Sequence, residues 1–311
     1  MAFYSPDAPM GQRLESVLGL LQRQRPDSAS SSLSLTWLRF PQAPQPAATA
    51  AAEWPLIAGG QERARPCGVS WRGEQLQEPG GLVALPYLIA VEQWLREDRL
   101  LEEPELRRAL GAMVRQGSGD ALSYVLDRLS GTTSGPALLP SRRQAWERQR
   151  LLVNAWLAEL AWPELKGASA CHKTWGEGPY GQDRQFLEGA GAPGNRLSSE
   201  GLARLLWAVL EGTLVSPPAC RRMGEVLQHE ASPRGWLAQR LPAEARRWGL
   251  AACGAAGVQE AVYVESAGGR EPQLLVVLAS GAPWPEQTNL LSELGQMLLS
   301  GQPLPASAAL A

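Results

Sequence analysis

Side chains that commonly carry catalysis are scarce in this sequence. Its 311 residues include two histidines, His172 and His229, and two lysines, Lys166 and Lys173, so arginine supplies nearly all of the positive charge. Two imidazoles are too few for a zinc hydrolase that binds its metal through several histidines. Any reaction that needs a lysine has only two candidates.

Cysteine is equally sparse. Cys67, Cys171, Cys220 and Cys253 are widely separated and form no C-x-x-C pair. We therefore expect buried free thiols, rather than a disulfide framework or a metal site, and no cofactor. Cys171 stands next to His172, but adjacency in the sequence does not create a nucleophile–base pair.

Long apolar runs are also missing. The longest, residues 81–91, is about half the length of a membrane span, and the first residues, MAFYSPDAPMGQR, lack the basic and apolar regions of a signal peptide. We therefore expect a cytoplasmic protein that does not enter a membrane. The formal net charge of −2 gives no electrostatic reason to expect a nucleic-acid partner.

What the sequence does contain is regular apolar patterning, with 44% hydrophobic and 19% charged residues, as in ordinary globular proteins. Helical spacing of apolar residues predicts helices at 10–21, 81–95, 106–114, 122–129, 146–160, 198–211, 217–230 and 290–298. Strands are indicated at 31–40 (half-buried, by its alternation), 67–72, 261–266 and 273–280. Residues 41–55 and 163–196 read as loops.

The order of these elements predicts an α+β fold. Strands near both ends of the chain are expected to form one antiparallel sheet with the terminal helices, over residues 1–75 and 235–311. Residues 76–234 are expected to form an all-helical lobe.

Several stretches resemble the class A β-lactamases and penicillin-binding serine hydrolases of the cyanobacterial type. They are SLTWLRF, EPGGLVALPYL, GSGDALSYVLDRLSGTTSG, HKTWGEGPYG, NRLSSEGLARLLWAVLEG and the AVYVE hairpin, in this order, between about Leu33 and Leu298. The resemblance implies a class A β-lactamase/DD-peptidase-like fold, with a sheet lobe from both termini and a helical middle lobe. It also implies a serine that attacks the acyl carbonyl and a lysine one turn later that tunes its proton.

The Ser-x-x-Lys pair of that family is absent. Gly81-Leu82-Val83-Ala84 stands in its place, so the nucleophile and lysine positions are Gly81 and Ala84. Neither lysine of the chain has a serine three residues before it, so the pair is not displaced along the sequence. An acyl-enzyme of the family type cannot form without the serine.

Other parts of the family's site have candidate equivalents. Ser118-Gly119-Asp120 resembles the family's second motif, in which the serine shuttles a proton and the third residue binds the substrate amide. The interpretation we favour is that Ser118 caps the helix that follows, with Asp120 in its first turn. Glu177 lies where class A enzymes place the glutamate that activates the deacylating water, but a glutamate between two glycines also suits an exposed turn.

The third motif, a Lys-x-Gly strand that binds the substrate carboxylate, has two possible registers. Arg247-Trp248-Gly249 keeps a positive charge and a glycine, so Arg247 and Gly249 are candidate substrate-binding residues. The register at 250–252 keeps nothing of the motif. Lys173-Thr174-Trp175 ends in tryptophan rather than glycine and lies in a predicted loop.

These features favour a pseudoenzyme: a β-lactamase-like fold without its nucleophile, which binds a small molecule or a peptide in the cleft between the lobes. Ser118, Asp120 and Arg247 would contact that ligand. The alternative is an active serine or amide hydrolase with a rebuilt site, in which Ser118 is the nucleophile and the base is unidentified. A scaffold that binds no ligand is a third interpretation.

Overall fold

A computed structural model describes residues 3–24, 33–41, 65–189, 194–229, 235–254, 257–266, 270–281, 284 and 288–304. The expected loop at 41–55 lies outside these residues, except for Pro41. No helix in the described part of the chain is long and apolar enough to cross a membrane.

Within the described residues, one sheet contains seven strands in the order β1-β3-β2-β7-β6-β5-β4. The strands are β1 (Ser5–Pro6), β2 (Leu33–Arg39), β3 (Cys67–Trp71), β4 (Gln228–His229), β5 (Arg246–Gly254), β6 (Gly257–Glu265) and β7 (Gln273–Ser280). β2 pairs antiparallel with β7, which joins the two ends of the chain in one sheet as expected. The short strand β1 pairs parallel with β3.

The described residues also form ten α-helices and two short 3₁₀ helices, η2 and η3. The 3₁₀ helices are η2 (Gly80–Val83) and η3 (Pro163–Leu165). The α-helices are α1 (Ala8–Gln24), α2 (Ala84–Arg96), α3 (Pro104–Arg115), α4 (Gly119–Ser130), α5 (Pro140–Arg150), α6 (Leu152–Glu159), α7 (Gly181–Leu187), α8 (Ser199–Glu211), α9 (Pro217–Leu227) and α10 (Asn289–Leu299).

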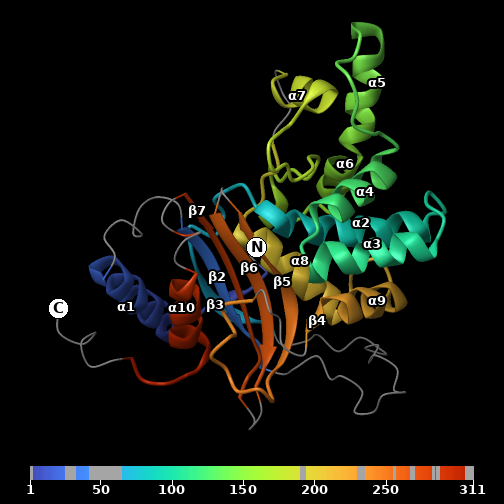
Figure 1. The fold of residues 1–311 in the computed structure, drawn as a ribbon. Helices are drawn as coiled ribbons and strands as arrows, with labels where there is room; N and C mark the ends of the chain where they lie inside the picture. The colour runs from blue at the N-terminus through green and yellow to red at the C-terminus, as the bar shows by residue number, and fades with distance from the viewer. Residues whose placement is uncertain are drawn as a thin grey trace.

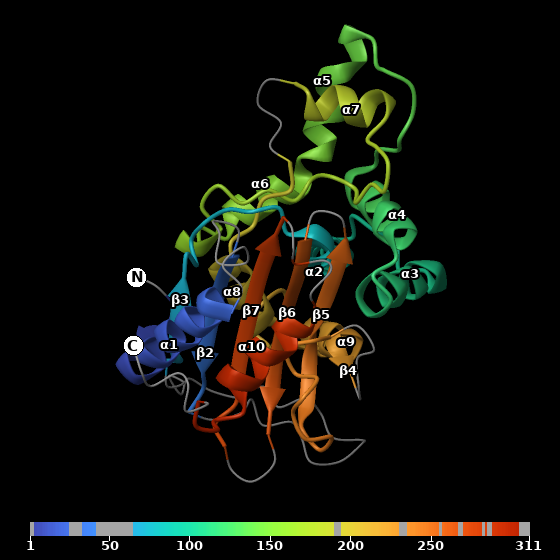
Figure 2. The same cartoon turned by 60° about the vertical axis from the view of Figure 1, so that its left-hand side comes forward.

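The sheet lies between two helical layers, so the α+β class is confirmed. α1 and α10 cover one face of the sheet. α8 and α2 lie against the other face, with α3, α4 and α9 beyond them, and these five helices are called the helical layer below (Figure 1). α5 and α7 project from the helical layer past the end of the sheet (Figures 1 and 2). The limits 76 and 234 of the helical lobe stay predictions.

The half-buried pattern expected for the first long strand is wrong. β2 is buried on both faces because helices cover both sides of the sheet. Its polar residues are enclosed as well: the Thr36 hydroxyl lies 2.8 Å from that of Ser199 in α8, and Ser34 is fully buried. Sequence alternation reports the polarity of side chains, and here short hydroxyl side chains face the helical layer.

Three further expectations need correction. The helix expected at 146–160 is two helices, because the chain turns at Leu151. The expected loop at 163–196 contains η3 and α7. His229, expected near a helix end, lies in β4, because α9 ends at Leu227 and the next two residues pair with β5.

Candidate functional site

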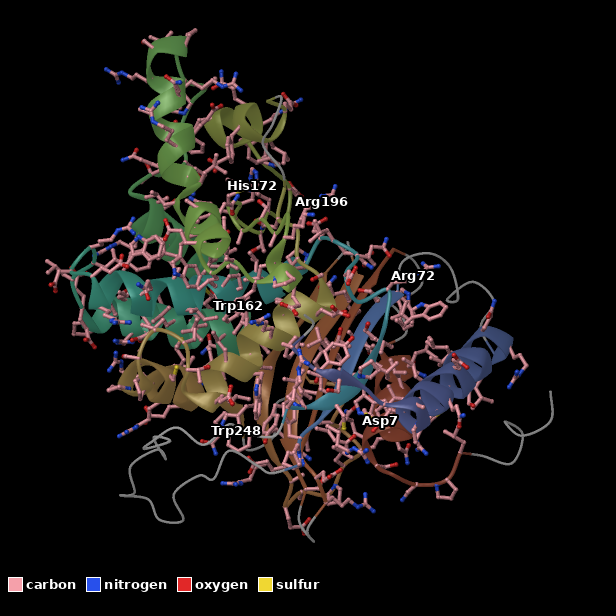
Figure 3. All side chains as sticks on the ribbon, turned by 180° about the vertical axis from the view of Figure 1, so that it is seen from behind. Asp7, Arg72, Trp162, His172, Arg196 and Trp248 are labelled. Atoms are coloured by element: carbon pink, nitrogen blue, oxygen red, sulfur yellow. The ribbon has the colours of Figure 1, made fainter. Side chains whose placement is uncertain are left out.

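A cleft of about 740 Å³ lies where the helical layer meets the ends of β5 and β6. Its walls come from segments far apart in the sequence, which are 78–81, the turn between α3 and α4, 172–179, 194–196, 250–254 and 257–259. His172 and Arg196 lie beyond the upper end of the sheet in Figure 3, whereas Trp248 lies toward its opposite end.

Gly81 lines the cleft, and its backbone packs directly on strand β5. A Cβ atom at Gly81 would lie 2.7 Å from the Cβ of Ala252, closer than side-chain carbons approach in proteins. Gly80 has a φ of 51°, and a Cβ there would overlap the side-chain amide of Gln259. Glycine is therefore required at this turn both for its backbone angle and for the close approach of the sheet. The wall offers no space for a serine side chain at Gly81 as it stands.

Ala84 follows one turn later, at the beginning of α2, and is 1% exposed. A lysine there would bury its ammonium group in the core of the helical layer unless its chain reached the cleft. Pro86 is in the first turn of α2, where its missing N–H removes no hydrogen bond of the helix.

Ser118 is the N-cap of α4, where its Oγ accepts a hydrogen bond from the backbone N–H of Ala121 at 3.2 Å. Its neighbour Gly117 lines the cleft, so Ser118 lies at the rim. Asp120, in the first turn of α4, is exposed. This is the capping arrangement expected from the sequence, and the catalytic roles of both residues stay predictions.

Glu177 is exposed in the turn formed by 176–178, and within the described residues it makes no hydrogen bond or ion pair. Its neighbour Gly178 lines the cleft. The glutamate is therefore near the cleft, but the fold does not aim or hold its carboxylate.

The structure does not bring Arg247 and Gly249 to the cleft. Both line a smaller cavity at the other side of β5, and Arg247 Nη2 donates hydrogen bonds to the carbonyls of Leu241 and Pro242. Side chains alternate along a strand, and Trp248 and Leu250 face the helical layer, so Arg247 and Gly249 face away from it. The second register considered, 250–252, does line the cleft.

Sequence reasoning missed the end of β5. Cys253 and Gly254 line the cleft beside Ala252, and Cys253 is exposed. The only signal was the run LAACGAAG, whose small residues give no periodicity to place them.

Lys173 lines the cleft but points its ammonium group into a buried ion network. Its Nζ donates to Asp127 Oδ2 and to Ser134 Oγ, both at 2.8 Å. Arg150, 1% exposed, lies 3.3 Å from Asp127 and 2.9 Å from Asp183. Both hydrogen bonds direct the Lys173 ammonium group into this network and away from a ligand in the cleft.

His172 is 6% exposed, and its buried Nε2 has no hydrogen-bond partner among the residues that the structure describes. Burial, with the Arg150 guanidinium nearby, lowers the pKa of His172 to about 4, so the ring is neutral at neutral pH. Cys171 is fully buried, and burial raises the pKa of its thiol. A buried thiol with a raised pKa does not act as a thiolate nucleophile.

Asn195 fixes the wall that carries these residues. Its Oδ1 accepts from the backbone N–H groups of Cys171 and His172, at 3.0 and 2.9 Å, and its Nδ2 donates to the carbonyl of His172 at 2.9 Å. Tyr87 of α2 donates to the same carbonyl at 2.9 Å. The loop at 172–179 is thus held against α2 without a ligand. Sequence reasoning did not single out Asn195, because an isolated asparagine in a loop carries no pattern.

The described part of the chain holds no group of three or more His, Cys, Asp or Glu side chains that could bind a metal ion. The cleft therefore combines a main-chain strand edge, small residues and a few polar side chains. Among the described residues that line it there is no serine.

Comparison with known proteins gives the same architecture. Residues 152–301 match the β-lactamase enzyme family. The β-lactamase of Sphaerobacter thermophilus superposes with a TM-score of 0.60 and 11% identity, over 92% of this chain and 96% of that one. PBP-A superposes with a TM-score of 0.61 and 14% identity, over 96% of this chain and 97% of that one.

A PBP-A variant described as an acyl-enzyme complex with penicillin G has the same TM-score of 0.61 and 14% identity, over 96% of this chain and 98% of that one. No curated protein matches the chain in sequence. The likeness to class A β-lactamases and penicillin-binding proteins expected from the sequence motifs is confirmed.

Proposed function

We propose that this chain, which has the class A β-lactamase fold and matches the β-lactamase enzyme family over residues 152–301, is a binding protein that does not form an acyl-enzyme. The packing of Gly81 on Ala252 carries this proposal. The position expected for the nucleophile lacks a hydroxyl group and also the space for one. The replacement of the expected serine by Gly81 is therefore matched by the close contact between η2 and β5.

The remaining polar groups support the same conclusion. A serine nucleophile needs a base within hydrogen-bond reach. The Oγ of Ser118 accepts the capping N–H of Ala121, and the nearby ammonium group of Lys173 is already paired with Asp127. Asp120 and Glu177 are both exposed, and among the described residues neither carboxylate is hydrogen-bonded to the Ser118 hydroxyl.

The outer edge of β5 favours an extended peptide as the ligand. On that side β5 pairs only with β4, through Arg247 and Trp248, and the described residues include no strand beside 250–252. That stretch lines the cleft. An exposed strand edge binds an extended peptide through main-chain hydrogen bonds, and small residues such as Ala252 let the backbone approach closely. Glu78 and Arg196, both exposed at the cleft, would contact polar side chains of the peptide.

Intact-mass spectrometry after incubation with benzylpenicillin tests the loss of acylation. The unchanged protein, Ser118→Ala and Cys253→Ser are compared, because Cys253 is an exposed cysteine at the end of the cleft and is another group that would take an acyl label. We expect no adduct on any of the three. A stoichiometric adduct that Ser118→Ala abolishes would establish the alternative, an active hydrolase with a relocated nucleophile.

Binding is tested in the same samples through the rate of Cys253 alkylation by iodoacetamide. Millimolar N-acetyl-trialanine amide, a short extended peptide, should slow alkylation of Cys253 and leave that of Cys67, on β3 at the far side of the sheet, unchanged. No protection by this peptide or by benzylpenicillin would contradict a binding role and favour a scaffold.

A further inference from the structure

A second cavity, of about 120 Å³, lies on the face of the sheet opposite the helical layer. Gly249 and Ala251 of β5 form its floor, and Glu260 and Val262 of β6 form one wall. The segment 235–239, which packs against α10, closes another side. The cavity exists because the two β5 residues that face outward here carry no side chain or only a methyl group.

Glu260 places a carboxylate in this cavity. The side chain is 3% exposed, and its Oε2 accepts from the backbone N–H groups of Trp236 and Leu237, at 2.7 and 2.9 Å. Among the described residues it has no ion-pair partner. A buried carboxylate without a cation is costly, and burial raises the pKa of Glu260 to about 7.

Arg247 supplies a donor at the other end of the same cavity. Its Nη2 is bound to the carbonyls of Leu241 and Pro242, at 3.2 and 3.0 Å, which fixes the guanidinium. Its Nε is buried and has no hydrogen-bond partner among the described residues. Glu260 pairs with Ala251 of β5, and Ala251 is four residues after Arg247. The Cα atoms of Arg247 and Ala251 are therefore about 13 Å apart along β5.

Counting only partners from the described residues, the cavity therefore presents an unpaired carboxylate and an unpaired donor on either side of its floor. Its volume leaves room for several water molecules. We propose that it binds a small zwitterionic α-amino acid, glycine, alanine or serine, with the ammonium group at Glu260 and the carboxylate at Arg247 Nε. The ligand would supply both the cation and the acceptor that the described residues do not provide to Glu260 and to Arg247 Nε.

The pH dependence has a defined sign. Binding needs the ionised form of Glu260, and the ammonium group of the ligand stays charged throughout the range. Of the charged groups on the surrounding elements, Arg247 of β5 is held by the 241–242 carbonyls, and Arg240 pairs with Glu293 of α10. With a pKa of about 7, the ionised fraction of Glu260 rises about tenfold from pH 6 to pH 8, and affinity rises with it.

Isothermal titration calorimetry of the full chain with glycine tests the proposal, at pH 8 and pH 6. Ethylammonium chloride and sodium acetate serve as the two half-ligands. Glu260→Gln and Arg247→Gln are compared with Glu265→Gln and Arg246→Gln, the ion pair formed by the residue before Arg247 and its partner in β6, neither of which lines the cavity. The amide oxygen introduced by Glu260→Gln can still accept the two backbone hydrogen bonds, and thermal unfolding verifies the fold of each variant.

We expect glycine to bind the unchanged protein about tenfold more tightly at pH 8 than at pH 6. Glu260→Gln, Arg247→Gln and the half-ligands should each weaken binding at least tenfold, and the two control variants should stay within twofold. Three results would overturn the proposal: no binding at 50 mM glycine at pH 8, unchanged affinity in Glu260→Gln, or ethylammonium binding as tightly as glycine. The outcome is independent of the cleft, which Glu260 does not line.

Discussion

Adding a single methyl group at Gly81 tests whether the cleft wall is closed at the nucleophile position. In Gly81→Ala the new Cβ would lie 2.7 Å from the Cβ of Ala252, so η2 and β5 must separate. Overpacking of this kind costs about 1–3 kcal/mol. The usual gain of replacing glycine by alanine in a helical turn, about 0.5–1 kcal/mol, offsets part of that cost.

Ala252→Gly is the complementary variant, because it removes the Cβ atom with which the new methyl group would clash. If the contact causes the destabilisation, the double variant Gly81→Ala with Ala252→Gly should be more stable than the sum of the two single effects predicts. A coupling of about 1 kcal/mol or more is expected, in the range for residues in direct contact. Gly111→Ala in α3 is the control, since its Cβ would meet nothing within 4 Å and should stabilise the protein by about 0.5–1 kcal/mol.

Urea unfolding followed by circular dichroism gives the free energy of unfolding for all four variants. Additive effects at Gly81 and Ala252, or a Gly81→Ala variant as stable as Gly111→Ala, would refute the reasoning. Either result would mean that the wall yields easily at Gly81. The absence of a serine would then be a matter of sequence alone, and restoring the hydroxyl would become a realistic route to acylation.

Two further predictions concern the wall formed by the 172–179 loop and α7. Asp183→Ala should lower the free energy of unfolding by about 3 kcal/mol, because it leaves the buried Arg150 with Asp127 as its one ion-pair partner among the described residues. The control Arg184→Ala, which breaks the exposed pair with Glu188, should lower it by less than about 1 kcal/mol. Equal effects of the two variants in urea unfolding would contradict the importance of the buried pair. His172 has a folded-state pKa of about 4 against 6.5 unfolded, so its contribution is complete above pH 6.5 and is lost as pH falls toward 4. His172→Phe should therefore reduce the loss of stability between pH 7.5 and pH 4.5 by about 2–3 kcal/mol relative to the unchanged protein, and an identical pH profile would show that the ring is not buried neutral.

Much of the fold follows from local patterns. Leucines at helical spacing predict α3, α4 and α8, and Ser118, Ser198 and Ser216 cap the helices expected to follow them. What failed depends on long-range packing. β2 looks half-buried because its polar residues alternate, but Thr36 meets Ser199, a partner 163 residues away that no local pattern indicates.

The candidate site was predictable in part, for the same reason. Three segments that carry recognisable motifs do line the cleft. They are EPGG, the turn before Ser118 and the loop at 172–179. Arg247 was chosen for its charge, and charge does not report which face of a strand a residue occupies. Trp248 and Leu250 pack in the core on the side of the helical layer, and the alternation of the strand therefore places Arg247 on the opposite face.

The walls of the cleft are held by contacts that require no ligand. Gly80 and Gly81 lie directly on the sheet, Asn195 and Tyr87 fix the loop at His172, and the Lys173 ammonium group is held by Asp127. A site fixed in advance does not bear the entropy cost of ordering its loops when a ligand enters. The contact between Gly81 and Ala252 is therefore among those that shape the cleft, and a ligand would enter a cleft whose walls are already in place.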